Sequence, residues 1–243
     1  VELALASRGV QVFGYDKMKQ LVWFWQALCG NKHKLADEVE KLQEQYVIRN
    51  GKTVTGCSKD SFHQYREDLK TESFTFSHER AAKYYVVNRS SFSGATFSGG
   101  WSERASYARF TDSSIDRIKN FSQPNLSVDC LDFKHSIKKH PNTFMYLDPP
   151  YMLSDKQREK LYGKSGNTHS DFDHEGLFEI LKDRKNWIMS YGGEEKKILQ
   201  MYKGFDIMDV SGEWTYGMKN VKSPQQIKPK KMGKSSEVLI KSK

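Results

Sequence analysis

The sequence lacks several features that would assign it to a class at once. No apolar run is long enough to span a membrane, and nothing resembles a signal peptide. Its cysteines, Cys29, Cys57 and Cys130, are odd in number and far apart, which argues against disulfides or a thiolate metal site and for a reducing compartment. The histidines show no metal-ligand spacing, so we predict no metal. These absences favour a globular protein of the cytoplasm.

What is present suits a partner that carries many negative charges. The chain has 243 residues, enough for one α/β domain with a large insertion, and a net charge of +9. A basic balance favours nucleic acid, although many soluble proteins share it. Hydrophobic residues at 37% are slightly few, but too many for a disordered chain.

The most informative stretch runs from Phe144 to Tyr151. Its apolar first half predicts a buried strand, which stops at Asp148-Pro149-Pro150-Tyr151. Proline has no N–H and a fixed φ, so the two prolines end the strand and stiffen the turn after it. Open α/β sheets bind ligands at the carboxyl ends of their strands. The alternative is a turn with one exposed acid, but this tetrapeptide occurs by chance in roughly one chain in a thousand of this size.

Methylation of an exocyclic amino group suits this arrangement. The carboxylate of Asp148 and the carbonyl oxygen of Pro149 would each accept one N–H of an adenine amine. That would direct the nitrogen lone pair towards a methyl donor. Tyr151 would stack on a base taken out of the helix, and Pro150 would keep the acceptors rigid.

Asp-Pro-Pro-Tyr resembles motif IV of amino-methyltransferases, and its Asp resembles that of the adenine-N6 enzymes. Further stretches resemble the DNA adenine methylase (Dam-like, alpha-group) family in the same order; they are residues 1–28, 85–89 with Gly94, 130–133, 172–175 and 237–240. The resemblance is thin between about Asn31 and Ser77. It implies S-adenosylmethionine as the cofactor and methylation of adenine N6 in duplex DNA.

Strands alternate with helices outside the middle of the chain, which predicts a Rossmann-like, doubly wound, mainly parallel α/β sheet. We expect strands at 10–15, 127–131, 144–147, 186–191, 205–210 and 237–241, and helices at 1–8, 17–28, from about Lys134, 173–181 and 194–202. Residues 31–123 are polar and basic, with helices at 34–46, 61–69 and 78–87 and a turn or hairpin at 51–56. Residues 1–30 and 124–243 are therefore predicted to form the catalytic domain, and 31–123 a helical target-recognition insertion.

Acids at two further strand ends are candidates for the cofactor. Asp16 would receive the ribose hydroxyls. The resemblance implies that Asp132 binds the adenine amino group and Phe133 its ring, with Asp148 also beside the cofactor. The alternative for both Asp16 and Asp132 is a helix cap.

The family carries a Gly-rich strand–turn of the type Phe-x-Gly-x-Gly upstream of such a helix, and this sequence contains none. We therefore expect that an N-terminal segment is missing from this chain or comes from another polypeptide. Without it, S-adenosylmethionine is expected to bind weakly, because the methionine end needs a close backbone approach.

Two segments are candidates for contact with DNA. The first is the small-residue loop 88–101, with Asn88, Arg89, Phe92 and Trp101, followed by Arg104 and Arg109; the alternative is a surface loop whose aromatic residues are tucked into the local core. Asn88-Arg89 match the family, but Ser90-Ser91 depart from it and leave the base specificity open. The second is a basic hairpin between residues 214 and 235, with Lys219, Lys222, Lys228, Lys230 and Lys231. A solvated charge run is its alternative.

The predicted enzyme is a monomer or weak dimer, with residues 152–171 as a lid. Methylation of adenine in RNA and a catalytically silent DNA-binding relative are the alternatives. Whether the enzyme is solitary or partners a restriction enzyme stays open.

Overall fold

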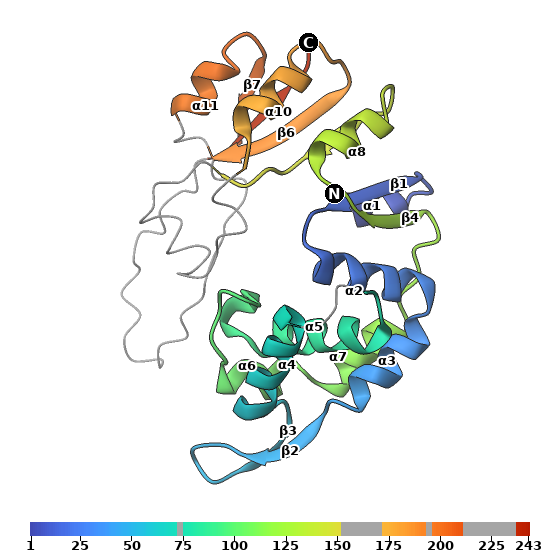
Figure 1. Cartoon of the computed structure of the whole chain (residues 1–243), viewed down its shortest axis with the longest axis vertical. Helices are drawn as coiled ribbons and strands as arrows, with labels where there is room; N and C mark the ends of the chain where they lie inside the picture. The colour runs from blue at the N-terminus through green and yellow to red at the C-terminus, as the bar shows by residue number, and fades with distance from the viewer. Residues whose placement is uncertain (72–74, 152–171, 193–195, 211–236) are drawn as a thin grey trace. The chain divides into compact units, whose positions relative to one another are not determined.

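A computed structural model describes residues 1–71, 75–151, 172–192, 196–210 and 237–243 (Figure 1). The described residues divide into two units, Val1–Lys139 and the part from His140 onwards, and each is considered by itself. Both units mix helices with small sheets, so the α/β class is confirmed.

The first unit holds most of the helices. Its elements are α1 (Glu2–Ala6), β1 (Val12–Asp16), α2 (Lys19–Gly30), α3 (Lys32–Glu40), β2 (Glu44–Val47), β3 (Thr53–Gly56), α4 (Lys59–Thr71), α5 (His78–Ser90), η1 (Phe92–Gly94), α6 (Glu103–Ala108), α7 (Asp112–Lys119), β4 (Leu126–Cys130) and α8 (Phe133–Lys139). The second holds β5 (Met145–Leu147), α10 (His174–Leu181), β6 (Trp187–Gly192), α11 (Lys196–Met201), β7 (Asp206–Asp209) and β8 (Glu237–Lys241).

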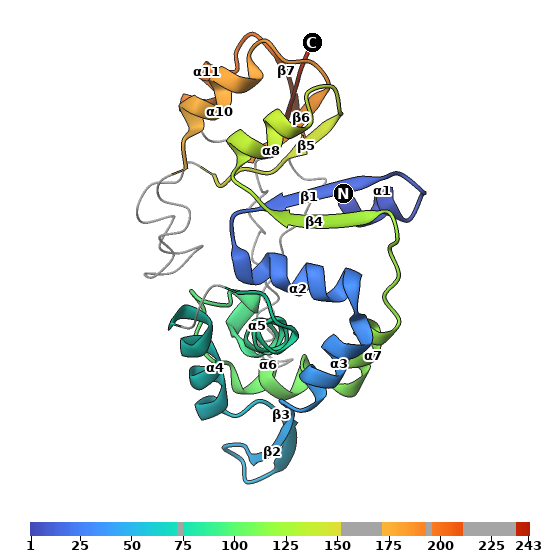
Figure 2. The same ribbon diagram turned by 45° about the vertical axis from the view of Figure 1, so that its right-hand side comes forward.

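Strands β1 and β4 form a parallel pair, with Asp16 opposite Cys130 in the register. Helix α2 packs along this pair, and Figure 2 shows the two strands side by side with α2 next to them. Both strands run in the same direction, so the residues that follow them lie at one sheet edge. The strands and the helix were predicted, with boundaries shifted by about two residues.

Helix α5 is the centre of the first unit. It packs against α2, α3, α4 and α6, and it is seen almost end-on in Figure 2. Its residues Ala81, Ala82, Val86 and Val87 are fully buried, as expected of a helix with neighbours on every side. Lys83 is buried as well, with only 8% of its surface exposed, and its ammonium lies 2.8 Å from the carboxylate of Asp68 on α4.

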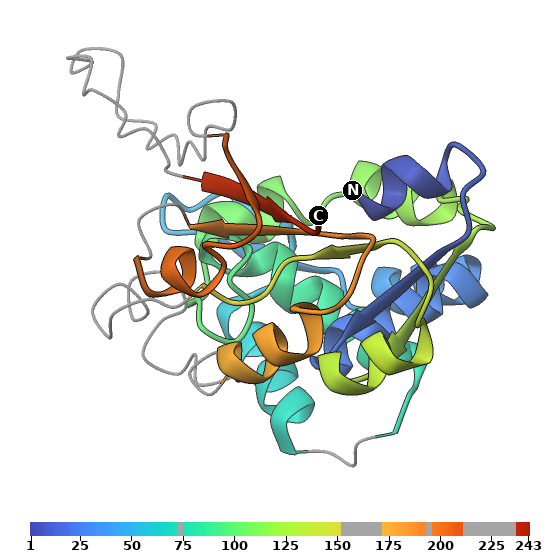
Figure 3. The same ribbon diagram turned by 90° about the horizontal axis from the view of Figure 1, so that it is seen from above.

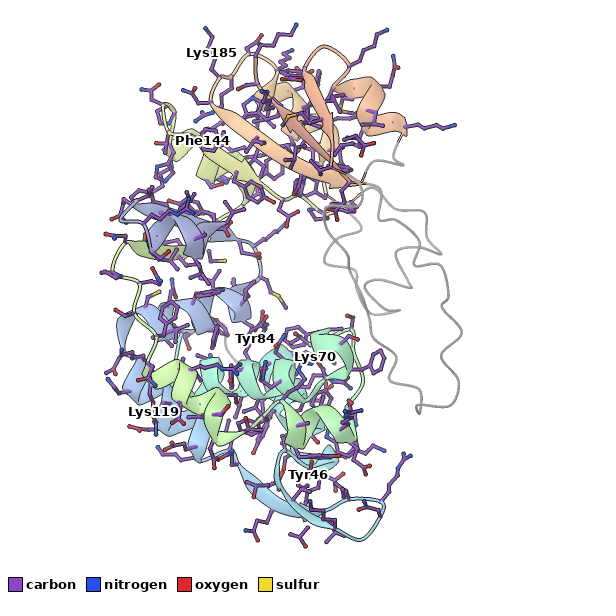
Figure 4. All side chains as sticks on the ribbon, turned by 180° about the vertical axis from the view of Figure 1, so that it is seen from behind. Tyr46, Lys70, Tyr84, Lys119, Phe144 and Lys185 are labelled. Carbon is purple, nitrogen blue, oxygen red and sulfur yellow. The ribbon has the colours of Figure 1, made fainter. Side chains whose placement is uncertain are left out.

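One hydrophobic core joins α2 to the helices of the predicted insertion. Trp23, Ala27 and Leu28 of α2 belong to the same cluster as Val86 and Val87 of α5. Figure 4 labels Tyr84, which lies on the side of α5 that faces α2, with its ring centroid 6.4 Å from that of Phe24. The core is therefore continuous across residue 30, and the division into a catalytic domain and a target-recognition insertion stays a prediction.

The predicted helix over residues 34–46 is wrong in its second half. Helix α3 ends at Glu40, and Glu44–Val47 instead form β2, which pairs antiparallel with β3. Apolar spacing in this segment imitates a helix, but Tyr46, Val47 and Ile48 favour a strand. Asn50-Gly51 supplies the turn, with Gly51 at φ +82°. The turn or hairpin predicted at residues 51–56 is confirmed as the turn and second strand of a longer hairpin, whose first strand is β2.

The second unit contains a four-stranded sheet in the order β5-β6-β8-β7. Strands β5 and β6 are parallel, with Leu147 opposite Met189, while β8 is antiparallel to both of its neighbours. The prediction of a mainly parallel sheet is thus wrong for β8. Strands β7 and β8 pair with Asp206 opposite Lys241 and Asp209 opposite Val238.

Helices α10 and α11 lie on one side of this sheet, as Figure 3 shows from above. Aromatic residues fill the space between: the Trp187 ring lies 5.2 Å from Phe205, and Phe178 of α10 lies 5.2 Å from Tyr202. The helices predicted at 173–181 and 194–202 are both confirmed. A single doubly wound sheet built from β1, β4 and β5–β8 stays a prediction.

Candidate active site

Asp148 directly follows β5 and is held there by a neighbouring strand. Ser190 of β6 donates a hydrogen bond of 2.9 Å to Oδ1 of Asp148. Tyr146 in turn donates to the Ser190 hydroxyl at 3.1 Å. Because a hydroxyl that donates to a carboxylate can still accept one bond, the three groups form a directed chain from Tyr146 to Asp148. The Asp148 carboxylate is solvent-exposed, and the hydrogen bond from Ser190 to one of its two oxygens fixes its orientation.

Pro150 and Tyr151 are held by the next residue of β6, Tyr191. The hydroxyl of Tyr191 donates to the carbonyl oxygen of Pro150 at 3.2 Å, and it also bonds Nδ1 of His174 at 2.9 Å. The rings of Tyr191 and Tyr151 stack, with centroids 5.3 Å apart and planes at 26°. Pro149 is buried and Pro150 half-buried, so the motif is a fixed turn.

Consecutive residues of β6 thus contact the same tetrapeptide from two sides. Side chains of neighbouring strand residues point to opposite faces of a sheet. Ser190 reaches the acid at the start of the motif and Tyr191 the carbonyl and ring near its end. Sequence reasoning missed Ser190, Tyr191, Tyr146 and His174. The strand predicted at 186–191 was the one sequence signal that could have pointed to Ser190 and Tyr191. Only the register of this strand beside β5 shows which of its residues contact Asp148.

His174 begins α10, whose amino end is capped by Asp173. Oδ1 of Asp173 accepts the N–H of Gly176 at 2.7 Å. A Cβ at position 176 would lie 2.2 Å from Oδ2 of Asp173, so a larger residue there would make the carboxylate turn. Burial first, and then the charge of Lys197, lower the pKa of His174. The imidazole is therefore neutral at neutral pH.

The predicted cofactor acids lie at one sheet edge of the first unit. Asp16 ends β1 and its carbonyl accepts the N–H of Leu131 at 3.2 Å, just before Asp132 and Phe133. Oδ1 of Asp16 accepts the N–H of Met18 at 2.6 Å, and Oδ1 of Asp132 accepts that of Lys134 at 2.9 Å. Oδ1 of Asp132 thus bonds the first turn of α8, as the capping alternative has it, whereas Asp16 bonds Met18, which is itself the N-cap of α2. In the described part of the chain, no hydrogen bond reaches Oδ2 of either carboxylate.

Asn88 and Arg89 bind the chain's own backbone. The amide of Asn88 donates to the Gly94 carbonyl at 2.9 Å and to the Thr96 hydroxyl at 3.0 Å. The guanidinium of Arg89 donates twice to the Arg109 carbonyl, at 2.8 and 2.6 Å. These contacts support the loop that comes next, so a role of either residue in reading DNA stays a prediction.

The loop after Asn88 has an unusual backbone. Ser93 (φ 55°), Gly94 (φ 74°) and Thr96 (φ 49°) all adopt left-handed conformations, which are rare for residues other than glycine. The aromatic residues of the loop differ in their exposure. Trp101 is tucked in, with its indole N–H 3.0 Å from the Cys57 carbonyl oxygen, whereas Phe92 is 59% exposed.

Arginine side chains gather near this loop. Arg109 contacts it, donating to the Ser91 carbonyl at 3.4 Å. Burial, together with the charge of Arg89, lowers the pKa of Arg109. Among the residues that the structure describes, no carboxylate forms an ion pair with Arg89 or Arg109. Arg104 is exposed on α6.

Several predicted features lie outside the described residues. These are the five lysines of the basic hairpin (Lys219, Lys222, Lys228, Lys230 and Lys231) and the lid over residues 152–171. Within the described ranges, no three His, Cys, Asp or Glu residues are grouped so that they could hold a metal ion. No described helix is both long and apolar enough to cross a membrane.

The family model for D12 class N6 adenine-specific DNA methyltransferases matches residues 1–216. This range includes the Asp16–Asp132 edge, the loop after Asn88 and the Asp148–Tyr151 turn. A search of curated proteins returned no match. With most of its length covered by this one family, the chain belongs to the D12 class N6 adenine-specific DNA methyltransferases.

Proposed function

We propose that this chain transfers a methyl group from S-adenosylmethionine to N6 of an adenine flipped out of duplex DNA. The observation that carries the proposal is the Asp148 carboxylate at the end of β5, anchored by Ser190 at 2.9 Å on one oxygen only. A carboxylate fixed in this way can accept a hydrogen bond on its other oxygen without turning away.

The reaction asks little of the protein beyond acceptors in the right place. The N6 amine is a weak nucleophile because its lone pair is delocalised into the ring. Oδ2 of Asp148 would accept one of its N–H groups and the Pro149 carbonyl the other. No described residue donates a hydrogen bond to either acceptor. With both bonds made, the lone pair would lie along the line of transfer, which is an advantage of positioning.

Tyr151 is proposed to bind the flipped base by stacking. An extrahelical base loses its neighbours in the helix, and an aromatic ring replaces part of that stacking energy. Tyr191 stacks on Tyr151, with ring centroids 5.3 Å apart, and would hold this ring in place for the base. The two prolines would hold this ring and the two acceptors in one rigid piece.

The residues at the β1–β4 edge suit an adenosine group. Asp16 and Asp132 each use Oδ1 for a main-chain N–H, so each retains an oxygen that could accept a ribose hydroxyl or an adenine amino group. Phe133 is half-buried next to Asp132 and could stack on the adenine ring. S-adenosylmethionine supplies an electrophilic methyl group on a sulfonium, and Asp148 would lie beside it.

Contact with DNA is proposed for the loop after Asn88 and for the basic hairpin. The loop offers exposed Phe92 as a wedge and the cations Arg104 and Arg109 for phosphates, with Asn88 and Arg89 as its internal supports. Residues 31–123 would recognise the target, and 1–30 with 124–243 would catalyse transfer. The motif order supports assignment to the Dam-like subtype.

Family membership favours DNA over the two alternatives, RNA methylation and a silent DNA-binding relative. The test is to incubate the full-length protein with labelled cofactor and either duplex DNA or RNA, and then to identify the modified nucleoside. N6-methyladenine in the DNA sample is the expected product. Label in RNA alone, or label on cytosine, would contradict the proposal, and binding to DNA without label would favour the silent relative.

A further inference from the structure

Tyr191, which is buried, and His174, which is half-buried, are connected to the Asp148–Tyr151 turn by hydrogen bonds. Tyr191 is 1% exposed, and its hydroxyl contacts both the Pro150 carbonyl oxygen at 3.2 Å and Nδ1 of His174 at 2.9 Å. A buried hydroxyl with two good partners is costly to disturb. This pair of contacts therefore fixes a main-chain atom in the middle of the motif.

The direction of each bond follows from the chemistry of the partners. A carbonyl oxygen only accepts, so the single Tyr191 hydrogen is given to Pro150. The Tyr191 oxygen must then accept from His174, which requires the imidazole to carry its hydrogen on Nδ1. The bonds run from His174 through Tyr191 to Pro150, and the capped start of α10 holds the histidine in place.

Aromatic stacking adds a second contact to the same motif. The Tyr191 ring lies 5.3 Å from that of Tyr151, with an angle of 26° between the planes. One side chain thus sets both the carbonyl of Pro150 and the tilt of the ring that follows it. A small change in that tilt would move the Pro149 carbonyl and Tyr151 relative to the base, and misplacement of reacting groups is costly.

We propose that Tyr191 and His174 are positioning residues for methyl transfer, acting through the Pro150 carbonyl and the Tyr151 ring. This inference rests on the proposed function, and it adds two residues that act without touching the base or the cofactor. It predicts that they affect the rate of the bound complex more than the binding of DNA.

The matched pair of variants is Tyr191→Phe and Tyr202→Phe. Both remove one hydroxyl from a tyrosine that is 1% exposed in the same unit, but the Tyr202 hydroxyl has no hydrogen-bond partner among the described residues. Tyr191→Phe should lower kcat about fivefold to tenfold and change KM for DNA by less than about twofold. Tyr202→Phe should leave both unchanged. Equal kcat in the two variants would overturn the proposal, even if Tyr191→Phe also lowered the unfolding temperature.

His174 provides the conservative rescue. His174→Asn places an amide N–H close to where Nδ1 donates and should retain most of kcat, whereas His174→Leu should match Tyr191→Phe. Loss of kcat by the asparagine and leucine variants alike would contradict the proposed donor role.

A spectroscopic readout separates this inference from the proposed function. Nitrogen-15 NMR of the full chain should show His174 as the Nδ1–H tautomer, and Tyr191→Phe should shift that signal. An Nε2–H tautomer overturns the hydrogen-bond order whatever the activity. If the wild-type chain methylated no DNA, the proposed function would fall, and the tautomer would still decide whether the two residues hold Pro150.

Discussion

The hydroxyl of Ser190 lies between Tyr146 of β5 and Asp148, which directly follows β5. It donates a hydrogen bond to Asp148 at 2.9 Å and accepts one from Tyr146 at 3.1 Å. This relationship joins parallel strands at the position where the motif begins. It makes the orientation of Asp148 depend on a residue 42 positions away. The carboxylate and the hydroxyl that holds it can therefore be tested separately by mutation.

Asp148→Ala should abolish methyl transfer while leaving DNA affinity largely intact. The carboxylate would act at the reacting amine, so its removal takes away transition-state stabilisation and no docking contact. The measurement is incorporation of label from S-adenosylmethionine, together with DNA binding in a gel-shift titration. Asp183→Ala, at another exposed acid of the same unit, is the control. Near-normal turnover by Asp148→Ala would remove the basis of the proposed function.

Ser190→Ala should lower kcat by a moderate factor. One hydrogen bond to a charged group contributes roughly 1.5–3 kcal/mol, which corresponds to about tenfold to a hundredfold in rate if all of it acts on orientation. Tyr146→Phe, which removes the preceding bond, should have a smaller effect in the same direction. Ser242→Ala is a matched control, since Ser242 contacts Trp187 at the other end of β6. Identical rates for Ser190→Ala and Ser242→Ala would show that the bond does not orient the carboxylate.

Asp16→Ala and Asp132→Ala should each raise KM for S-adenosylmethionine, and kcat at saturation should change less. Each acid would contact a part of the cofactor remote from the transferred methyl group, so its loss removes uniform binding. The control is Asp129→Ala, which removes an exposed acid of β4. Its carboxylate lies 3.8 Å from the ammonium of Lys139, and its loss should have little effect. Cofactor titration by calorimetry gives the affinities. An unchanged affinity in both variants would place the cofactor elsewhere.

Neutralising Lys228, Lys230 and Lys231 together should weaken binding to all DNA sequences alike and flatten its dependence on salt. Each lost phosphate contact lowers the slope of log affinity against log salt by about one unit. The control removes the same charge from Lys41, Lys70 and Lys182, each of which lies within 2.8 Å of a glutamate one turn away. Equal slopes in the two triple variants would mean that the basic hairpin faces solvent.

The cysteines should react with alkylating reagents in the order Cys130, Cys29, Cys57. Thiolate is the reactive form. Burial raises the pKa of Cys57 to about 12 and also raises that of Cys29. A raised pKa means less thiolate at neutral pH, and Cys57 is fully buried, so reaction at Cys57 should require unfolding. Mass spectrometry of partially labelled protein, from neutral pH upwards, gives the order. Rapid labelling of Cys57 at neutral pH would contradict the core of the first unit, where this residue is fully buried.

The sequence was most informative where short-range signals act alone. The strands before Asp16, Asp132 and Asp148 follow from apolar runs that end in an acid, and the Asp173 cap of α10 follows from residue preference at helix ends. In contrast, residues 41–47 carry apolar spacing that fits a helix, and the pairing of β2 with β3 overrode it. The turn residues Asn50-Gly51 were the better signal.

Long-range relationships were beyond the sequence. Nothing in residues 186–191 alone indicates that Ser190 and Tyr191 flank the Asp148–Tyr151 turn, because strand register depends on packing of the whole sheet. For the same reason, the sequence did not show that Asn88 and Arg89 hydrogen-bond within the loop, and their predicted contact with DNA stays a prediction. A polar side chain in a loop can reach many acceptors of its own chain, and the sequence does not show which of them it binds.

If residues 31–123 recognise the target as proposed, the central place of α5 limits how new target specificities could arise. The helices around it share their apolar side chains with α2, so this segment is not a cassette that can be cut out and exchanged between enzymes. A graft joined at residues 30 and 124 would expose Trp23 and Leu28 unless the donor carried matching side chains. Diversification is therefore easier at exposed positions such as Val47 of the β2–β3 hairpin and Phe92, which are 66% and 59% exposed.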